Sequence, residues 1–256
     1  MKRSLFCGAL CCALLITGCE GTPTGRVEPA KYTLFGLAEM NLDDDTDYLY
    51  LEFTADGQPV AGSYALMAND TLFFDTTGTI SVSTPEVVWG FNADVVITVY
   101  DTAAGFSHTV SATIPSQFTI YNFIPPTHIY QGDNVSLEWY SWAGAAGYFV
   151  TCVARGADSE ARGFAETVGL EGLSITIEPE TFQERSYPFD RVVDSFYVFV
   201  IAYNPTYEPR PGSKYTDTGQ MDFLDFSSSI SGKDISGAFG AAVVSQREAI
   251  DVVALP

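Results

Sequence analysis

Short runs of β-branched and aromatic residues, each closed by a turn signal, dominate this chain of 256 residues. Before residue 115 such runs occupy residues 48–53, 71–74, 79–82 and 95–100, and Gly, Asp, Asn and Pro gather in the turns between them. No long segment repeats its apolar residues with the 3.6-residue period of a helix. Because alternation with period two places apolar side chains on one face of a strand, the pattern predicts an antiparallel β-sandwich.

A second series of runs follows a short connector marked by Pro115, Pro125 and Pro126. The expected strands lie at residues 135–139, 147–150, 173–177 and 196–204; residues 237–240 and 250–253 would form a last strand pair, and residues 179–182 a single helical turn. At 46% hydrophobic residues the chain has enough apolar mass for two cores. The fold class predicted is therefore all-β, with two tandem antiparallel β-sandwich domains at residues 32–116 and 117–256.

Three segments of the second series are similar to the fibronectin type III and related Ig-like sandwiches. Val135-Ser136-Leu137-Glu138-Trp139 resembles the second strand of that family, whose Trp packs between the sheets, and Gly147-Tyr148-Phe149-Val150 resembles the third. Residues 196–204 resemble the sixth strand, although Phe196 stands where the family usually has Tyr and so lacks the hydroxyl of the tyrosine corner. The resemblance implies a fold for residues 118–256, and a fold does not imply a function.

The first twenty residues resemble the export signal of bacterial lipoproteins. Lys2 and Arg3 precede an apolar stretch, residues 5–16, that is shorter than the roughly 20 residues of a membrane-spanning helix. The stretch ends in Leu15-Ile16-Thr17-Gly18-Cys19, which is similar to a lipobox. The resemblance implies cleavage of residues 1–18 and attachment of a diacylglyceryl group and an N-acyl chain to Cys19. Two or more acyl chains anchor a protein stably in a bilayer.

Residues 19–31 are expected to form a lipidated tether, because they are rich in Pro, Gly and Thr and have no apolar period. In the enterobacterial sorting rule, Asp after the lipidated cysteine retains a lipoprotein in the inner membrane; here Glu20 follows Cys19, which favours the outer membrane. The sequence therefore predicts an envelope protein on a lipid anchor. Cleavage would leave Cys152 as the single cysteine besides the anchor, without an intramolecular disulfide partner, and its place in an expected strand indicates a buried structural thiol.

The sequence contains no known catalytic motif. His108 and His128 have no carboxylate or cysteine at zinc-ligand spacing, and the chain has no nucleophile elbow, dinucleotide fingerprint or phosphate loop. The sequence indicates a protein that is not an enzyme and holds no cofactor besides its lipids. The alternative is an envelope hydrolase of the glycosidase type, with paired carboxylates in a cleft between the domains.

One acidic loop, residues 41–47, could bind Ca²⁺, because Asp43, Asp45 and Asp47 alternate along the chain and hard cations prefer carboxylate oxygens. The loop does not fit the helix-loop-helix calcium pattern, since Tyr48 and Thr54 stand where a Gly and a bidentate Glu are required. The other interpretation is a solvated acidic loop before a strand.

The charge distribution restricts the partners. The chain has 12 basic and 32 acidic residues, a formal charge of −20, and none of its Lys or Arg lies between residues 32 and 154. Nucleic acid is therefore excluded as a partner. Two explanations remain for the acidic half: solubility in a salty or divalent-rich medium, or attraction of a cationic partner or divalent ions.

The function predicted is a non-catalytic binding or scaffold lipoprotein that meets an envelope protein or a glycan. Aromatic residues are favoured at interfaces, and Trp89, Tyr140 and Trp142 are the candidates for such a surface. Tyr140 and Trp142 could equally cover a domain edge. An exposed contiguous aromatic patch would distinguish the two, because a monomer seldom exposes one without a use.

Overall fold

The computed structural model describes residues 31–43, 45–84, 89–124, 128–130, 134–140, 144–154, 163–168, 173–177, 195–205, 229–246 and 248–253. Every regular element in these ranges is a β-strand: β1 (Tyr32–Asn41), β2 (Thr46–Ala55), β3 (Gln58–Pro59), β4 (Tyr64–Met67), β5 (Asp70–Phe73), β6 (Thr79–Thr84), β7 (Asp94–Asp101), β8 (Phe106–Thr113), β9 (Thr119–Ile124), β10 (His128–Tyr130), β11 (Val135–Tyr140), β12 (Gly147–Ala154), β13 (Gly163–Val168), β14 (Ser174–Ile177), β15 (Ser195–Asn204), β16 (Ile230–Ser231), β17 (Ile235–Val244) and β18 (Glu248–Val253). Cys19 with its signal and tether, Trp142, and the helical turn expected at 179–182 lie outside the described residues. Within the described part, no helix is long and apolar enough to cross a membrane.

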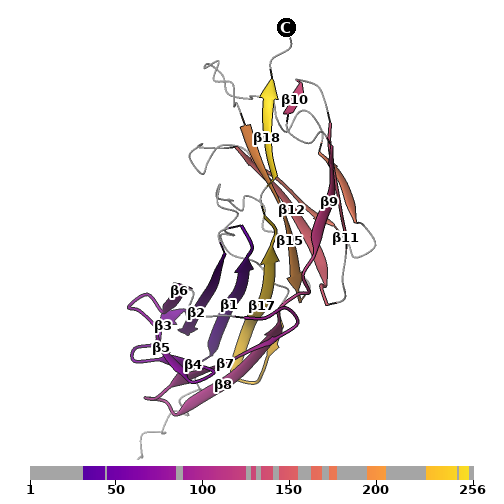
Figure 1. The fold of residues 1–256 in the computed structure, drawn as a ribbon. Helices are drawn as coiled ribbons and strands as arrows, with labels where there is room; N and C mark the ends of the chain where they lie inside the picture. Colours follow the sequence, from indigo (N-terminus) through magenta and orange to yellow (C-terminus); the bar gives the residue numbers. More distant parts are fainter. Residues whose placement is uncertain are drawn as a thin grey trace, which may run out of the picture. The chain divides into compact units, whose positions relative to one another are not determined.

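The first module, β1 to β8, is an antiparallel sandwich of two sheets (Figure 1). One sheet has the order β1-β2-β6, with the short β3 beside β2, and the other has the order β5-β4-β7-β8. The predicted run at residues 95–100 becomes β7, where Val95, Ile97 and Val99 are buried and alternate with exposed or half-buried neighbours. This alternation is what a sheet with one face in the core requires.

The second module, β9 to β15 with β18, repeats this arrangement (Figure 1). Its three-stranded sheet has the order β14-β11-β9, and the facing strands are β13, β12 and β15, with β18 beside β15. Apart from the short β3 and β10, the strands of the two modules correspond in order. The first, second and fifth form one sheet, which is β1, β2 and β6 in the first module and β9, β11 and β14 in the second. The third, fourth, sixth and seventh form the other sheet, which is β4, β5, β7 and β8 in the first module and β12, β13, β15 and β18 in the second. The all-β, tandem-sandwich prediction is confirmed at this level.

The core of the second module contains the tryptophan that the sequence placed there. Trp139 is fully buried, and its ring centroid lies 5.5 Å from that of Tyr148 on β12. Phe118 contacts Tyr148 edge to face at 5.8 Å, and Val150 and Val200 fill the same interior. These contacts across the two sheets are those that the family resemblance implied for Trp139.

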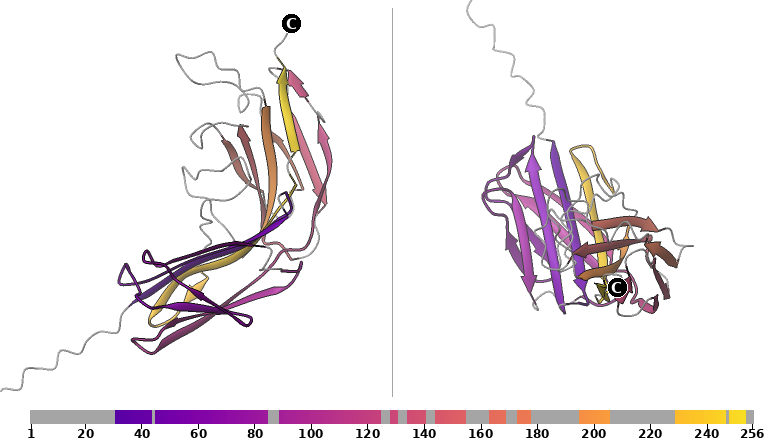
Figure 2. Two further views of the ribbon diagram at one scale, coloured as in Figure 1. Left: turned by 60° about the vertical axis from the view of Figure 1, so that its left-hand side comes forward. Right: turned by 90° about the horizontal axis from the view of Figure 1, so that it is seen from above.

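The strand β17 differs from the prediction. The sequence assigned residues 237–240 to a strand pair that closes the second domain, whereas β17 pairs in parallel with β1 of the first module over all ten of its residues, from Ile235 opposite Tyr32 to Val244 opposite Asn41. Only its last four residues, Ala241–Val244, also pair with β15. Figures 1 and 2 show this yellow strand beside β1 and continuing towards β15. A parallel ladder between segments two hundred residues apart leaves no local sequence signal.

Because β17 has neighbours on both edges, it joins the two modules in one eleven-stranded sheet. The face of β17 that looks away from the first sandwich is packed as well. A buried cluster there includes Leu37 of β1, Phe149 of β12, Phe199 and Ile201 of β15, and Ala242 of β17. The division of the chain at residues 116 and 117 remains a prediction, and the sheet crosses it.

Candidate binding surfaces

The predicted calcium residues do not gather into a common site. Asp47 accepts a hydrogen bond from the backbone N–H of Trp89 at 2.9 Å, and the backbone N–H of Asp43 donates to Asn41 at 2.9 Å. Burial raises the pKa of Asp47, and the bond from Trp89 opposes this rise. Among the described residues no three His, Cys, Asp or Glu side chains come together as a possible metal site. Calcium binding by this loop stays a prediction.

Of the predicted aromatic candidates the structure describes Trp89 and Tyr140, which lie in different modules. Trp89 is half-buried, and its backbone N–H donates the hydrogen bond to Asp47 of β2. Tyr140 is 56% exposed and stacks on Tyr121 of β9, with ring centroids 4.0 Å apart. The register between β9 and β11 shifts beside Tyr121, and this irregularity leaves the residue outside the regular pairing. The pair forms a small aromatic surface on the three-stranded sheet.

A longer row of aromatic side chains crosses the first module. Tyr64 on β4 is paired in register with Phe73 on β5 and with Tyr100 on β7. The Tyr64 and Tyr100 rings stack with centroids 4.7 Å apart, and the Phe73 ring lies 6.2 Å from that of Tyr64. Phe73 is 73% exposed, and the neighbouring inward residue Ala65 is fully buried, so the row stands on the outer face of this sheet. We call these three residues the aromatic row.

Sequence reasoning missed the aromatic row. Tyr100 lies in a predicted strand, where it alternates with the inward residues Ile97 and Val99, and this alternation could have placed it on the outer face. Its alignment with Tyr64 and Phe73 depends on the register of three strands. Register is not readable from one segment at a time, because it is set by the turns and by the facing core.

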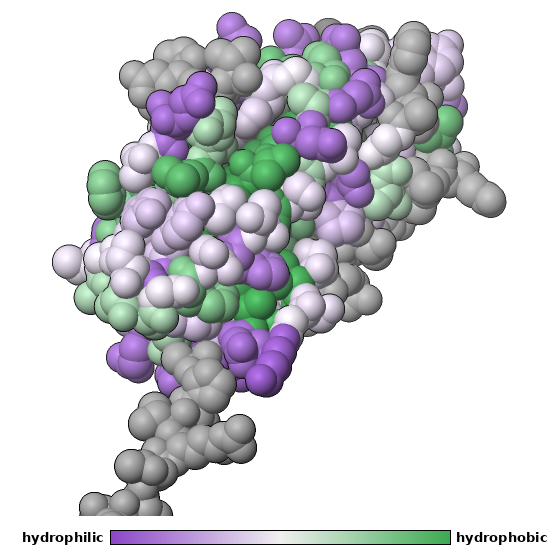
Figure 3. Space-filling model, turned by 90° about the horizontal axis from the view of Figure 1, so that it is seen from below, coloured by the Kyte–Doolittle hydropathy of each residue, from purple (hydrophilic) through white to green (hydrophobic). Residues whose placement is uncertain are grey.

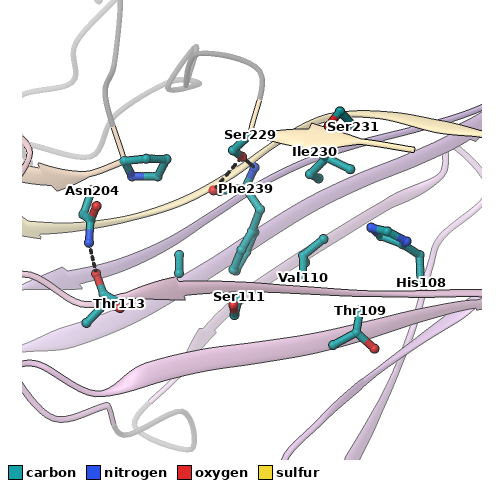
Figure 4. A pocket seen from close by; sticks show the side chains of 12 residues that line it. His108, Thr109, Val110, Ser111, Thr113, Asn204, Ser229, Ile230, Ser231 and Phe239 are labelled. Carbon is teal, nitrogen blue, oxygen red and sulfur yellow. Dashed lines mark hydrogen bonds between the residues drawn. The ribbon is translucent and has the colours of Figure 1, made fainter. Parts of the chain in front are cut away.

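An open groove lies at the opposite edge of the same sheet, between β8 and the β16–β17 pair. Its volume is about 450 Å³, and its lining includes His108, Val110, Ile230 and Phe239. Figure 4 shows the side chains of His108, Val110 and Phe239 in the space between these strands, with Ser111 turned away from it. At one end the side-chain amide of Asn204 donates to the carbonyl oxygen of Thr113 at 3.3 Å.

The groove combines an apolar floor with polar margins. Val110, Ile230 and Phe239 are at most 8% exposed, whereas Ser229 and Ser231 are exposed. Strongly hydrophobic residues also reach the surface as a strip between hydrophilic ones in the view from below (Figure 3). None of the described lining residues is a carboxylate, so the groove does not supply the acid pair that the hydrolase alternative needs.

No protein-family model and no curated protein sequence matches the chain. Among solved structures it is similar to a segment of two fibronectin type III domains from chicken tenascin, with 12% identity over 60% of this chain and 83% of that one, at a TM-score of 0.24. It is similar to fibronectin(III)-like modules of Clostridium thermocellum CbhA, with 9% identity over 87% of this chain and 94% of that one, at a TM-score of 0.26. A biofilm-associated protein domain has 13% identity over 88% of this chain and 31% of that one, also at 0.26.

The class of the protein rests on the order in which its strands pair, which both modules share. The sheets resemble those of tandem fibronectin type III or Ig-like β-sandwich modules. Sandwiches of this class occur in many cell-surface proteins, as modules that bind or connect other molecules.

Proposed function

We propose that this protein is a non-catalytic binding or scaffold module of the bacterial cell envelope, anchored in the membrane through lipids on Cys19. The lipobox-like residues 15–19 support the anchor, and Glu20 after the cysteine favours the outer membrane over the inner one. The partner is an envelope protein or a glycan that contacts the β-sandwich modules.

The observation that carries the binding role is the aromatic row. Its three rings are contiguous across three strands, and Phe73 leaves most of its surface in water. Exposing a large apolar side chain forgoes about 1.5–3 kcal/mol of burial free energy, which a partner recovers by covering it. Aromatic residues are also enriched at the energetic centres of interfaces.

Labelling of cells with radioactive palmitate tests the anchor. The wild-type chain should incorporate label and sediment with the membrane, whereas the Cys19→Ala variant should do neither. An unlabelled wild-type chain would refute the lipoprotein assignment.

A photo-crosslinking amino acid tests the binding surface. Placed at Phe73, it should yield a discrete adduct with an envelope protein, or retention of the chain on isolated cell-wall glycan. The matched control is Thr176 on β14, which is also exposed on the outer face of a sheet but has no aromatic row beside it. Equal adducts and equal retention at both positions would mean that the aromatic row is not the binding surface.

A further inference from the structure

The two sheets of the first module have unequal widths. With β17 and β16 added beyond β1, the first sheet has the order β16-β17-β1-β2-β6, whereas the facing sheet ends at β8 in the order β5-β4-β7-β8. The groove beside β8 therefore occupies the place where a fifth strand of the second sheet would face β17.

Backbone groups along β8 point into this groove. Ile114, just after β8, donates its N–H to the carbonyl of Ala93 and accepts the N–H of Asn92, so its backbone groups point towards β7. Because β7 and β8 keep one register without interruption, the other even-numbered residues of β8 also bond towards β7. The N–H and C=O groups of Thr109 and Ser111 then point away from β7.

Two side-chain contacts agree with this orientation. The hydroxyl groups of Thr98 and Thr109 lie 2.8 Å apart, and Thr113 donates to Asp94 at 2.6 Å. Such close cross-strand contacts are typical of opposed residues that do not exchange backbone bonds. Within the described part of the chain, no strand pairs with this edge of β8.

We propose that the β8 edge binds an extended cationic segment of a partner protein, which adds to the sheet as its fifth strand. Donors and acceptors repeat at every second residue along β8, at about 6.6–6.8 Å, which is the spacing another strand offers and a sugar chain does not. Inward side chains of the added strand cover Val110, Ile230 and Phe239.

Charge complementarity determines the character of the partner strand. Residues 32–154 carry fourteen acidic side chains and no Lys or Arg, and Asp94 lies on the outer face beside the β8 edge. Outward side chains of the added strand are therefore basic, which raises its rate of association. This inference goes beyond the binding role of the aromatic row, and each can fail without the other, because they use different residues and different probes.

The probe is a fluorescent heptapeptide of alternating Lys and Val, added to the full chain and to two proline variants. Ser111→Pro removes an N–H that points into the groove and leaves the ladder with β7 intact. Thr71→Pro is the matched control on β5, at the other edge of the same sheet. The N–H of Phe74 donates to the carbonyl of Ser63, and in this register the N–H of Thr71 points away from β4. Fluorescence anisotropy should show at least about a tenfold weaker affinity for Ser111→Pro and wild-type affinity for Thr71→Pro.

Amide hydrogen exchange on the wild-type chain gives a readout that needs no variant to fold. The peptide should slow exchange at Thr109 and Ser111, and the same heptapeptide with every backbone amide N-methylated, which cannot donate to β8 in either strand orientation, should not. A peptide of alternating Glu and Val should bind at least tenfold more weakly. Absence of binding, equal binding of the N-methylated peptide, or equal binding of the Glu-Val peptide would overturn the proposal.

Discussion

At Gly237 the backbone of β17 comes so close to β1 that a side chain has no room. A Cβ atom there would overlap the carbonyl oxygen of Leu34, and the φ angle of 136° is one that residues with a side chain rarely adopt. Glycine is therefore the residue that lets β17 reach β1 at this point. At this position glycine is required by the backbone conformation and by the close approach of β1.

Gly237→Ala should destabilise the protein by more than about 1–3 kcal/mol, the cost of the backbone conformation alone, because the overlap with Leu34 adds to it. The urea midpoint of unfolding measures the effect. Gly105→Ala is the control, since Gly105 also has a positive φ, 66°, but an added Cβ would meet nothing within 4 Å. Equal losses of unfolding free energy in the two variants would show that the overlap with Leu34 does not destabilise the protein.

Tyr32 links the start of β1 to the end of β7. Its hydroxyl donates to a carboxylate oxygen of Asp101 at 3.0 Å, and its ring stacks on Phe106 with centroids 3.8 Å apart. The other oxygen of Asp101 accepts the backbone N–H groups of Ala103 and Ala104, which fixes the turn before β8. Burial, followed by the bond to Asp101, raises the pKa of Tyr32 to about 12.

This pKa predicts a pH dependence. In the unfolded chain Tyr32 releases its proton near pH 10, whereas in the folded protein it keeps the proton until about pH 12. Its contribution to stability is therefore present below pH 10 and is lost as the pH rises from 10 to 12. Urea unfolding at a series of pH values should show a steeper loss above pH 10 for the wild type than for Tyr32→Phe. Parallel curves would contradict the assignment.

At the scale of elements, β17 and β18 act as two parts of one strand along β15. Val244 pairs with Ile201, and after the interruption Glu248 pairs with Val198. Between them Ser245 replaces the missing ladder bonds: its N–H donates to the carbonyl of Val200 at 2.9 Å, and its hydroxyl oxygen accepts the N–H of Val200 at 3.0 Å. A side chain thus satisfies a buried backbone group where the strand breaks.

Ser245→Ala should cost about 1–3 kcal/mol, because it leaves the N–H of Val200 buried without an acceptor. The urea midpoint should fall, and hydrogen exchange at Val200 should become faster. Ser231→Ala, at an exposed position on β16, should change neither quantity appreciably. Unchanged exchange at Val200 in Ser245→Ala would mean that the hydroxyl is not its acceptor.

At the scale of the whole molecule, the shared strand couples the stability of the two modules. Ala242 of β17 is fully buried and is paired with Glu39 of β1 on one side and Tyr203 of β15 on the other. A perturbation at this residue acts on both ladders at once. Two sandwiches joined by a simple linker would instead respond one at a time.

Ala242→Asp should destabilise the protein by more than about 3 kcal/mol, because it buries an uncompensated charge. Hydrogen exchange should become faster in β1 and in β15 together. Ala249→Asp on β18 introduces the same charge at an exposed position and should leave both strands protected. Faster exchange in only one of the two modules would argue against the coupling.

Local sequence patterns were sufficient for strands such as β2 and β7 and for one core residue, whereas β1, β4, β8 and β9 were not predicted. The run at residues 95–100 alternates with period two and becomes β7, and Trp139 packs between two sheets as the family resemblance implied. These features depend on neighbouring residues in one segment, where the side-chain period is directly visible. The exposed position of Tyr140 follows from the same alternation.

The sequence by itself determined the all-β class, the two series of strands and the acidic character of the surface. Only the tertiary structure decided that β17 joins β1, that Tyr64, Phe73 and Tyr100 form one row, and that the edge of β8 faces an open groove. The physical reason is that strand pairing is a contact between distant segments. Its register and its partner are chosen by backbone hydrogen bonds and by the facing core, which no single segment contains.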